Sequence, residues 1–137
     1  MNRTEDPQPP PTRPSAGPRP SRTRTLGAFG EAYAARHLVD RGMVLLDRNW
    51  RCELGEIDLV LRDGDTLVFC EVKTRSSALY GTPLESVTAR KAARLRRLAA
   101  RWLADHQLRP RDVRLDLVGV LVPRTGSPSV EHAAGVG

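Results

Sequence analysis

Three charged side chains stand close together in two neighbouring segments that have the composition of β-strands. Asp58 lies in the apolar segment 56–62, and Glu71 and Lys73 end the apolar segment 66–74. Charged groups at the edge of an apolar run lose hydration unless they are paired or bound to an ion. Asp58 and Glu71 supply the oxygen ligands that hard divalent cations such as Mg²⁺ or Mn²⁺ prefer. We therefore interpret this set of residues as a candidate cation site.

A cation held by these carboxylates would favour the hydrolysis of phosphate esters. A bound metal acidifies water and stabilises the charge that develops on a phosphoryl group. Lys73 would orient or deprotonate the attacking water, or neutralise the scissile phosphate. Glu31, in a helical segment earlier in the chain, is a further candidate ligand, either directly or through a bridging water.

A tight turn is expected to bring the two segments together as a hairpin, because Asp63-Gly64-Asp65 between them supplies a residue that tolerates positive φ. Alternation along the second strand places Glu71 and Lys73 on one face. Alternation along the first strand places Ile57, Leu59 and Leu61 on one face and Asp58 on the other. Asp58 then becomes a neighbour of Glu71, if the register permits.

The other elements flank this hairpin in the chain. Residues 26–41 carry apolar side chains at spacings of three and four and stop at Gly42, which predicts a helix. Residues 43–51 predict a strand that leaves the core. Residues 88–106 combine an apolar face with a cationic face and predict a second helix. Residues 113–122 predict the last strand.

This order of elements, α-β-β-β-α-β, defines the fold class. The last strand follows a long helix, so it can pair parallel with an earlier strand through a right-handed crossover. Near-continuous apolar runs in two strands suit a sheet that is covered on both faces. We predict an α/β fold with a mixed central sheet flanked by helices.

Composition divides the 137 residues into one domain and two tails. Residues 1–25 hold seven of the 11 prolines and almost no apolar residues, so we expect a disordered tail. Residues 26–122 form the expected domain, and 123–137 the expected flexible C-terminal tail. No apolar stretch is long enough to span a bilayer or to act as a secretory signal, so a cytoplasmic protein without membrane contact is expected. Cys52 and Cys70 lack metal-site spacing and are expected to be ordinary thiols.

The formal net charge of +6 is compatible with a nucleic-acid partner, although half of it comes from residues 1–25. Basic arginine usage without such a partner is an equal alternative. Further along the chain, Lys91, Thr74 and Arg75 are candidates for contacts with nucleic acid. For Thr74 and Arg75, solvation in a loop is the alternative. Four arginines in segment 88–106 form one row along the helix, which either contacts phosphates or is simply solvated: Arg90, Arg94, Arg97 and Arg101.

These motifs resemble a known family. The segments 55–60 (GEIDLV) and 69–75 (FCEVKTR) look like the D…E-x-K signature of the restriction-endonuclease-like, or PD-(D/E)xK, nucleases. More narrowly, the chain resembles the bacterial YraN family, which is similar to archaeal Holliday-junction resolvases. The resemblance runs from about residue 27 to residue 120 and includes Gly30-Glu31, Arg48-Asn49-Trp50-Arg51, Lys91 and Arg114-Leu115-Asp116.

The resemblance implies a restriction-endonuclease-like αβββαβ core and a nuclease active site. In that site Asp58 and Glu71 bind Mg²⁺ or Mn²⁺, Lys73 assists the water, and Glu31 is an accessory acid. The implied substrate is DNA, including branched or structured DNA, and resolvase-like relatives imply a homodimer. The segment 55–57 (GEI) departs from the wider pattern, in which a proline precedes the aspartate.

A second interpretation is a nucleic-acid-binding or assembly protein that retains the nuclease fold without turnover. For the three charged residues themselves, the alternative to catalysis is an ion pair of Lys73 with Asp58 or Glu71 at the rim of the sheet. We expect Glu56 to be solvated. For Asp116 two roles stay open, an ion pair with Arg114 or a place near the site, and the following two residues are expected in the core: Trp50 and Trp102.

Overall fold

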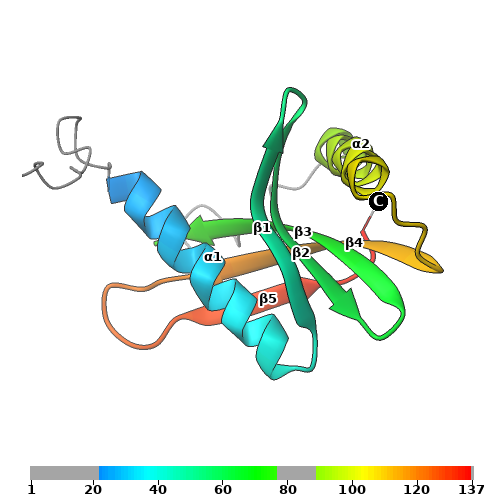
Figure 1. Cartoon of the computed structure of the whole chain (residues 1–137). Helices are drawn as coiled ribbons and strands as arrows, with labels where there is room; N and C mark the ends of the chain where they lie inside the picture. Colours follow the sequence, from blue (N-terminus) through cyan, green and yellow to red (C-terminus); the bar gives the residue numbers. More distant parts are fainter. Residues whose placement is uncertain (1–21, 77–88, 137) are drawn as a thin grey trace, which may run out of the picture.

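The computed structural model describes residues 22–76 and 89–136 (Figure 1). Two helices and five strands follow one another in the order α1 (Arg22–Asp40), β1 (Val44–Cys52), β2 (Gly55–Asp63), β3 (Thr66–Arg75), α2 (Ala89–His106), β4 (Asp112–Leu121) and β5 (Ser129–Ala133). The first six elements confirm the order expected from the sequence. In the part of the chain that the structure describes, neither helix is long and apolar enough to cross a membrane.

The five strands form one mixed sheet in the order β1-β2-β3-β4-β5. β3 and β4 are parallel, and the other neighbouring strands are antiparallel. The parallel pair is the one whose strands are separated in the chain by α2, as a crossover connection requires. The α/β fold with a mixed sheet is therefore confirmed, and it is compatible with a restriction-endonuclease-like core.

The two helices bury different sets of side chains against the sheet. α1 packs Ala34 and Leu38 in one cluster with Val68 of β3. α2 packs Leu98 in a second cluster with Phe69, the next residue of β3. Neighbouring residues of β3 thus serve opposite faces, which explains why the strand reads as a continuous apolar run.

β2 does not keep the alternation that we expected along its whole length. Leu59 packs in the cluster of α1, whereas Ile57, two residues earlier, packs in the cluster of α2. The pairing of β2 with β3 starts at Leu59, while its pairing with β1 extends back to Gly55. The β1–β2 hairpin therefore leaves β3 and stands beside α2 (Figure 1). The prediction that Ile57 shares a face with Leu59 is wrong, because a two-stranded ribbon twists more strongly than a sheet.

The C-terminal segment, expected to be a flexible tail, contains strand β5 instead. β5 pairs antiparallel with β4, and beyond it the Val136 N–H donates a 2.8 Å hydrogen bond to the Leu115 carbonyl. This segment also completes the environment of the buried Asp116: the Gly135 N–H donates to Oδ1 at 3.1 Å, and His132 Nε2 lies 2.7 Å from Oδ2. A polar segment of this kind becomes a strand through such distant contacts rather than through its own sequence pattern.

Asp116 is held from β4 itself by Arg114, which confirms the first of its two expected roles. The Arg114 guanidinium donates hydrogen bonds of 2.9 and 3.0 Å to the two carboxylate oxygens. Burial raises the pKa of Asp116, but the hydrogen bonds from Arg114, His132 and Gly135 lower it more, and the pKa is below its ordinary value. The charge is thus fully satisfied inside the fold.

α1 begins at Arg22, so the helix includes residues that we assigned to the disordered tail. The helix approaches the sheet closely at Gly30, which is buried. A Cβ atom added to Gly30 would lie 1.9 Å from Oγ1 and 2.8 Å from Cβ of Thr74 on β3. Only glycine allows this approach, and the approach brings the next residue, Glu31, to the edge of the sheet.

We expect Gly30→Ala to lower the free energy of unfolding by about 1–3 kcal/mol, since the added methyl group overpacks against Thr74. Urea unfolding measures this change. Gly27→Ala is the matched control in the same helix, because nothing lies within 4 Å of its added Cβ. It should be neutral or raise stability by up to about 1 kcal/mol. Equal effects of the two substitutions would contradict this account of the helix packing.

Candidate active site

Asp58 lies at the point where β2 separates from β3. The last paired residues of the two strands are Leu59 and Cys70, and Asp58 is the next residue of β2 toward the hairpin tip. Its Oδ2 accepts a 2.7 Å hydrogen bond from the backbone N–H of Val72. A side chain here takes the place of a backbone partner, which fixes the carboxylate in the gap between the strands.

Three carboxylates converge at this gap. One oxygen each of Glu31 on α1, Glu56 on β2 and Asp58 can be chosen so that all lie within 4.8 Å of one another. All three residues are half-buried. A set of oxygen donors without sulfur or imidazole fits a hard cation such as Mg²⁺ or Mn²⁺.

Glu71 lies beside this triad. Continuing the β2–β3 register by one step would place Glu71 opposite Asp58, and both residues line the same pocket. Glu71 Oε1 is 4.0 Å from Nη2 of Arg94 on α2. The structure therefore brings the predicted ligands Glu31 and Asp58 together and places Glu71 at the same pocket.

Glu56, which we expected to be solvated, joins the triad instead. Its side chain is 32% exposed, and its Oε1 lies 3.6 Å from Nε of Arg51. The twist of the β1–β2 hairpin away from β3 decides this placement. Strand alternation in the sequence carries no information about that twist.

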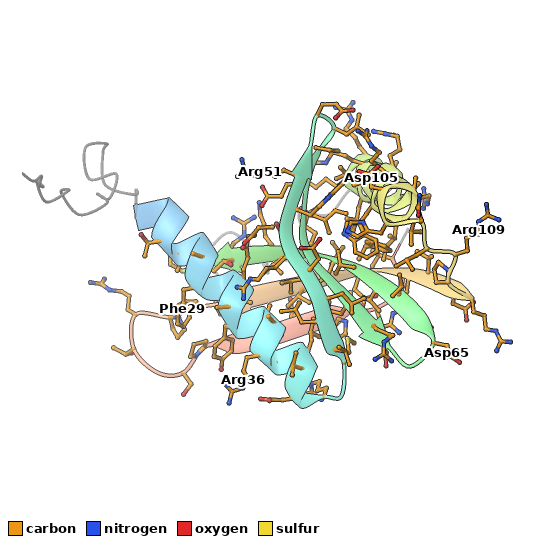
Figure 2. All side chains as sticks on the ribbon, in the orientation of Figure 1. Phe29, Arg36, Arg51, Asp65, Asp105 and Arg109 are labelled. Carbon is orange, nitrogen blue, oxygen red and sulfur yellow. The ribbon has the colours of Figure 1, made fainter. Side chains whose placement is uncertain are left out.

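The pocket has a volume of about 450 Å³ and combines acids with cations. Glu56, Asp58 and Glu71 supply its negative charge, and Arg51 and Arg94 line it from β1 and α2. Figure 2 shows Arg51 extending from the β1–β2 hairpin into the open space beside it. Such a mixture suits a ligand that carries both a cation and phosphate groups.

An ion pair connects α2 with the tip of the β1–β2 hairpin, two elements that line the pocket. The Arg101 guanidinium donates hydrogen bonds of 2.7 and 3.2 Å to the two carboxylate oxygens of Glu53. One member of the arginine row thus has a structural partner, whereas Arg94 lies at the pocket. The arginines of the predicted row therefore have different surroundings and do not act as one uniform cationic face.

Burial raises the pKa of Asp58 to about 7. The hydrogen bond from the Val72 N–H opposes this rise, while repulsion from the carboxylates of Glu31, Glu71 and Glu56 adds to it. This carboxyl therefore holds its proton to a higher pH than an ordinary aspartate does. A pKa shifted by burial and by neighbouring like charges is typical of functional sites.

The other predicted site residues lie around the end of β3. Lys73 is half-buried and lies two residues after Glu71 on β3, so strand alternation places both side chains on the same face. Thr74 packs beneath Gly30 of α1, so it is not the solvated loop residue that was the alternative. Arg75 has a buried Nε with no hydrogen-bond partner found for it in the described structure. Lys91 is half-buried on α2.

Asn49 contacts the triad, and sequence reasoning did not assign it to the site. Its side-chain Nδ2 donates a 2.7 Å hydrogen bond to Glu31 Oε1 and lies 3.5 Å from Glu56 Oε2. In the sequence it belonged only to the segment 48–51 (RNWR), which is part of the family resemblance. No spacing rule connects Asn49 with a helix residue 18 positions earlier.

Comparisons with known proteins agree on one family. Residues 30–120 match the model of the Uncharacterised protein family UPF0102. A UPF0102 protein of Nocardioides sp. is 67% identical over 114 residues, which cover 83% of this chain and 92% of the relative. A UPF0102 protein of Beutenbergia cavernae is 59% identical over 112 residues, 82% of this chain and 95% of the relative. A UPF0102 protein of Kineococcus radiotolerans is 58% identical over 112 residues, which cover 81% of this chain and 92% of the relative.

We expect Asp58→Asn to change how stability depends on pH in a metal-free buffer. The folded pKa of about 7 lies above the ordinary value of 3.8, so the unfolded chain releases this proton more readily. Asp58 then destabilises the native state as pH rises from about 4 to 7, by on the order of 2–4 kcal/mol. Asparagine at position 58 removes this pH-dependent loss of stability and keeps a hydrogen-bond acceptor for the Val72 N–H.

Urea unfolding of both proteins at a series of pH values measures the difference. Asp65→Asn, which removes a carboxylate from the exposed β2–β3 turn, controls for the change in net charge. If Asp58→Asn and wild type lose stability in parallel between pH 4 and 7, the account of this carboxyl is wrong.

Proposed function

The chain belongs to the UPF0102 family, which confirms its resemblance to the YraN family. We propose that it is a metal-dependent endonuclease that hydrolyses phosphodiester bonds in DNA. The observation that carries this proposal is the convergence of Glu31, Glu56 and Asp58 within 4.8 Å. Glu71 at the same pocket and Lys73 on the same strand support it.

The donor set fits the cation that this activity requires. Glu31, Glu56 and Asp58 would hold Mg²⁺ or Mn²⁺, and Glu71 offers a further carboxylate at the same pocket. When bound, the cation would supply an acidified water and stabilise negative charge on the phosphate. It would also favour the ionised form of Asp58, which burial alone disfavours near neutral pH.

The remaining residues of the pocket have roles that follow from their charge and position. Lys73 follows Glu71 by one strand alternation, so its ammonium group would orient the attacking water or neutralise the scissile phosphate. Arg51 and Arg94 are 3.6 and 4.0 Å from their carboxylate partners. These distances are long for ion pairs, so phosphate oxygens can compete for both guanidinium groups.

Three finer parts of the proposal rest on the sequence and its resemblance. They are a preference for branched or structured DNA, a homodimer with two sites for symmetric strands, and a cytoplasmic location. Thr74, Arg75 and Lys91 remain proposed contacts with nucleic acid in addition to Arg94. The packing of Thr74 against Gly30 makes a direct contact of its hydroxyl group the weakest of the four.

A nucleic-acid-binding protein without turnover is the second candidate. The observation that favours it is that Arg51 and Arg94 line the pocket, where they would attract phosphate groups whether or not a cation is bound. Both candidates predict binding that weakens with salt, and only the first predicts cleavage.

We expect the purified protein to nick DNA when Mg²⁺ or Mn²⁺ is added, with Asp58→Ala and Lys73→Ala each reducing the rate by at least about 100-fold. Branched and linear DNA are incubated side by side, and products are resolved on denaturing gels. Asp65→Ala is the control, because it removes an aspartate from an exposed turn outside the pocket.

Nicking that survives in both the Asp58 and the Lys73 variants would come from a contaminant and would count against the proposal. No nicking of any substrate, together with salt-dependent binding, would favour the second candidate.

We expect Arg51→Ala to weaken DNA binding and to reduce the slope of log K against log salt by about one, because one phosphate contact is lost. Arg36→Ala is matched to it: the two side chains are 76% and 79% exposed. Arg36 projects from α1 on the opposite side of the molecule (Figure 2). Fluorescence anisotropy at several salt concentrations measures both variants, and an equal loss in both would indicate non-specific attraction only.

A further inference from the structure

Asn49 has a backbone conformation that its strand does not require. It lies inside β1 with φ of 52°, and among the described residues the only other non-glycine residue with positive φ is Gln107. L-residues avoid this left-handed region because Cβ crowds the neighbouring carbonyl oxygen. Asn49 is exposed, so core packing does not explain why the conformation is kept.

The position of Asn49 in the sheet puts it next to the acidic triad. The β1–β2 register pairs Arg48 with Leu59 and Trp50 with Ile57. Asn49 therefore stands opposite Asp58. From there its amide reaches the other two acids of the triad, which come from different elements.

The amide nitrogen of Asn49 serves two carboxylates at once. It donates a 2.7 Å hydrogen bond to Glu31 on α1 and lies 3.5 Å from Glu56 on β2. Three carboxylates with oxygens within 4.8 Å repel one another. The positive end of an amide dipole between two of them offsets part of that repulsion without adding a charge.

On the basis of the proposed function, we propose that Asn49 is a positioning residue that holds Glu31 and Glu56 turned toward Asp58 before a cation binds. Glutamate side chains have several rotatable bonds and, when half-exposed, swing toward solvent to escape like charges. Ordering them during cation binding would cost affinity. A hydrogen bond that fixes a carboxylate before the cation binds lowers that cost, as hydrogen-bond partners of metal ligands do in known sites.

The residue type fits this role better than its alternatives. Asparagine enters the left-handed region more readily than most residues and carries two N–H donors. Glycine accepts the same conformation but has no donor. Aspartate would bring a further negative charge to the triad.

The test uses Asn49→Gly in the 137-residue chain, because glycine accepts the left-handed backbone conformation and lacks the side-chain amide. Gln107→Gly is the matched control, because it places glycine at the other left-handed residue, where φ is 55°. Gln107 follows the end of α2 and does not line the pocket. Two quantities are measured for wild type and both variants, the urea midpoint in metal-free buffer and the dissociation constant for Mn²⁺ by calorimetry.

We expect both variants to unfold at the same or a higher urea concentration than wild type. Asn49→Gly should raise the Mn²⁺ dissociation constant by about tenfold, whereas Gln107→Gly should leave it within about twofold. The midpoint shows that any loss of Mn²⁺ binding occurs in a folded protein.

Two results would overturn the inference while leaving the proposed function intact: unchanged Mn²⁺ binding in Asn49→Gly, or an equal loss in Gln107→Gly. If wild type itself takes up no Mn²⁺, this inference and the metal-dependent function both fail. The wild-type titration thus separates the failure of the proposal from the failure of Asn49 alone.

Discussion

The hydrogen bond from the Val72 N–H to the Asp58 carboxylate is the contact on which the arrangement of the pocket depends. Backbone pairing between β2 and β3 stops at Leu59 and Cys70, and this bond takes over where the ladder ends. The β1–β2 hairpin is then free to twist toward α2 and open a gap at the edge of the sheet. A regular ladder would fill that gap with backbone and leave no room for a group of acids.

Asp116 is buried and Asp58 is half-buried, and their carboxylates have opposite electrostatic environments. Asp116 receives hydrogen bonds from Arg114 and Gly135 and lies 2.7 Å from His132, and its pKa falls below the ordinary value. Asp58 is held by one backbone N–H among other carboxylates, and burial raises its pKa to about 7. The first charge is satisfied and stabilises the attachment of β5. The second charge lies among like charges, and environments that separate the pKa values of two carboxyl groups in this way often distinguish structural from chemical roles.

Contacts outside the pocket help to position its acidic side chains. The close approach at Gly30 brings Glu31 to the sheet, and the Arg101–Glu53 ion pair holds the hairpin tip to α2. The negative pocket belongs to a chain with a formal charge of +6, and arginines line the pocket beside the acids. Long-range attraction of a polyanion and local binding of a cation are therefore compatible in one molecule.

The sequence by itself determined the order of the elements, the mixed α/β sheet, and the position of Glu71 and Lys73 on one strand face, because these features depend on local periodicity and turn composition. It also singled out Asp58 and Glu31, two of the three residues whose carboxylate oxygens converge within 4.8 Å. Only the tertiary structure decided that Glu56 joins the triad and that residues 129–133 form a strand. These outcomes depend on the twist of an unpaired hairpin and on contacts between residues far apart in the chain, and neither leaves a mark in local spacing.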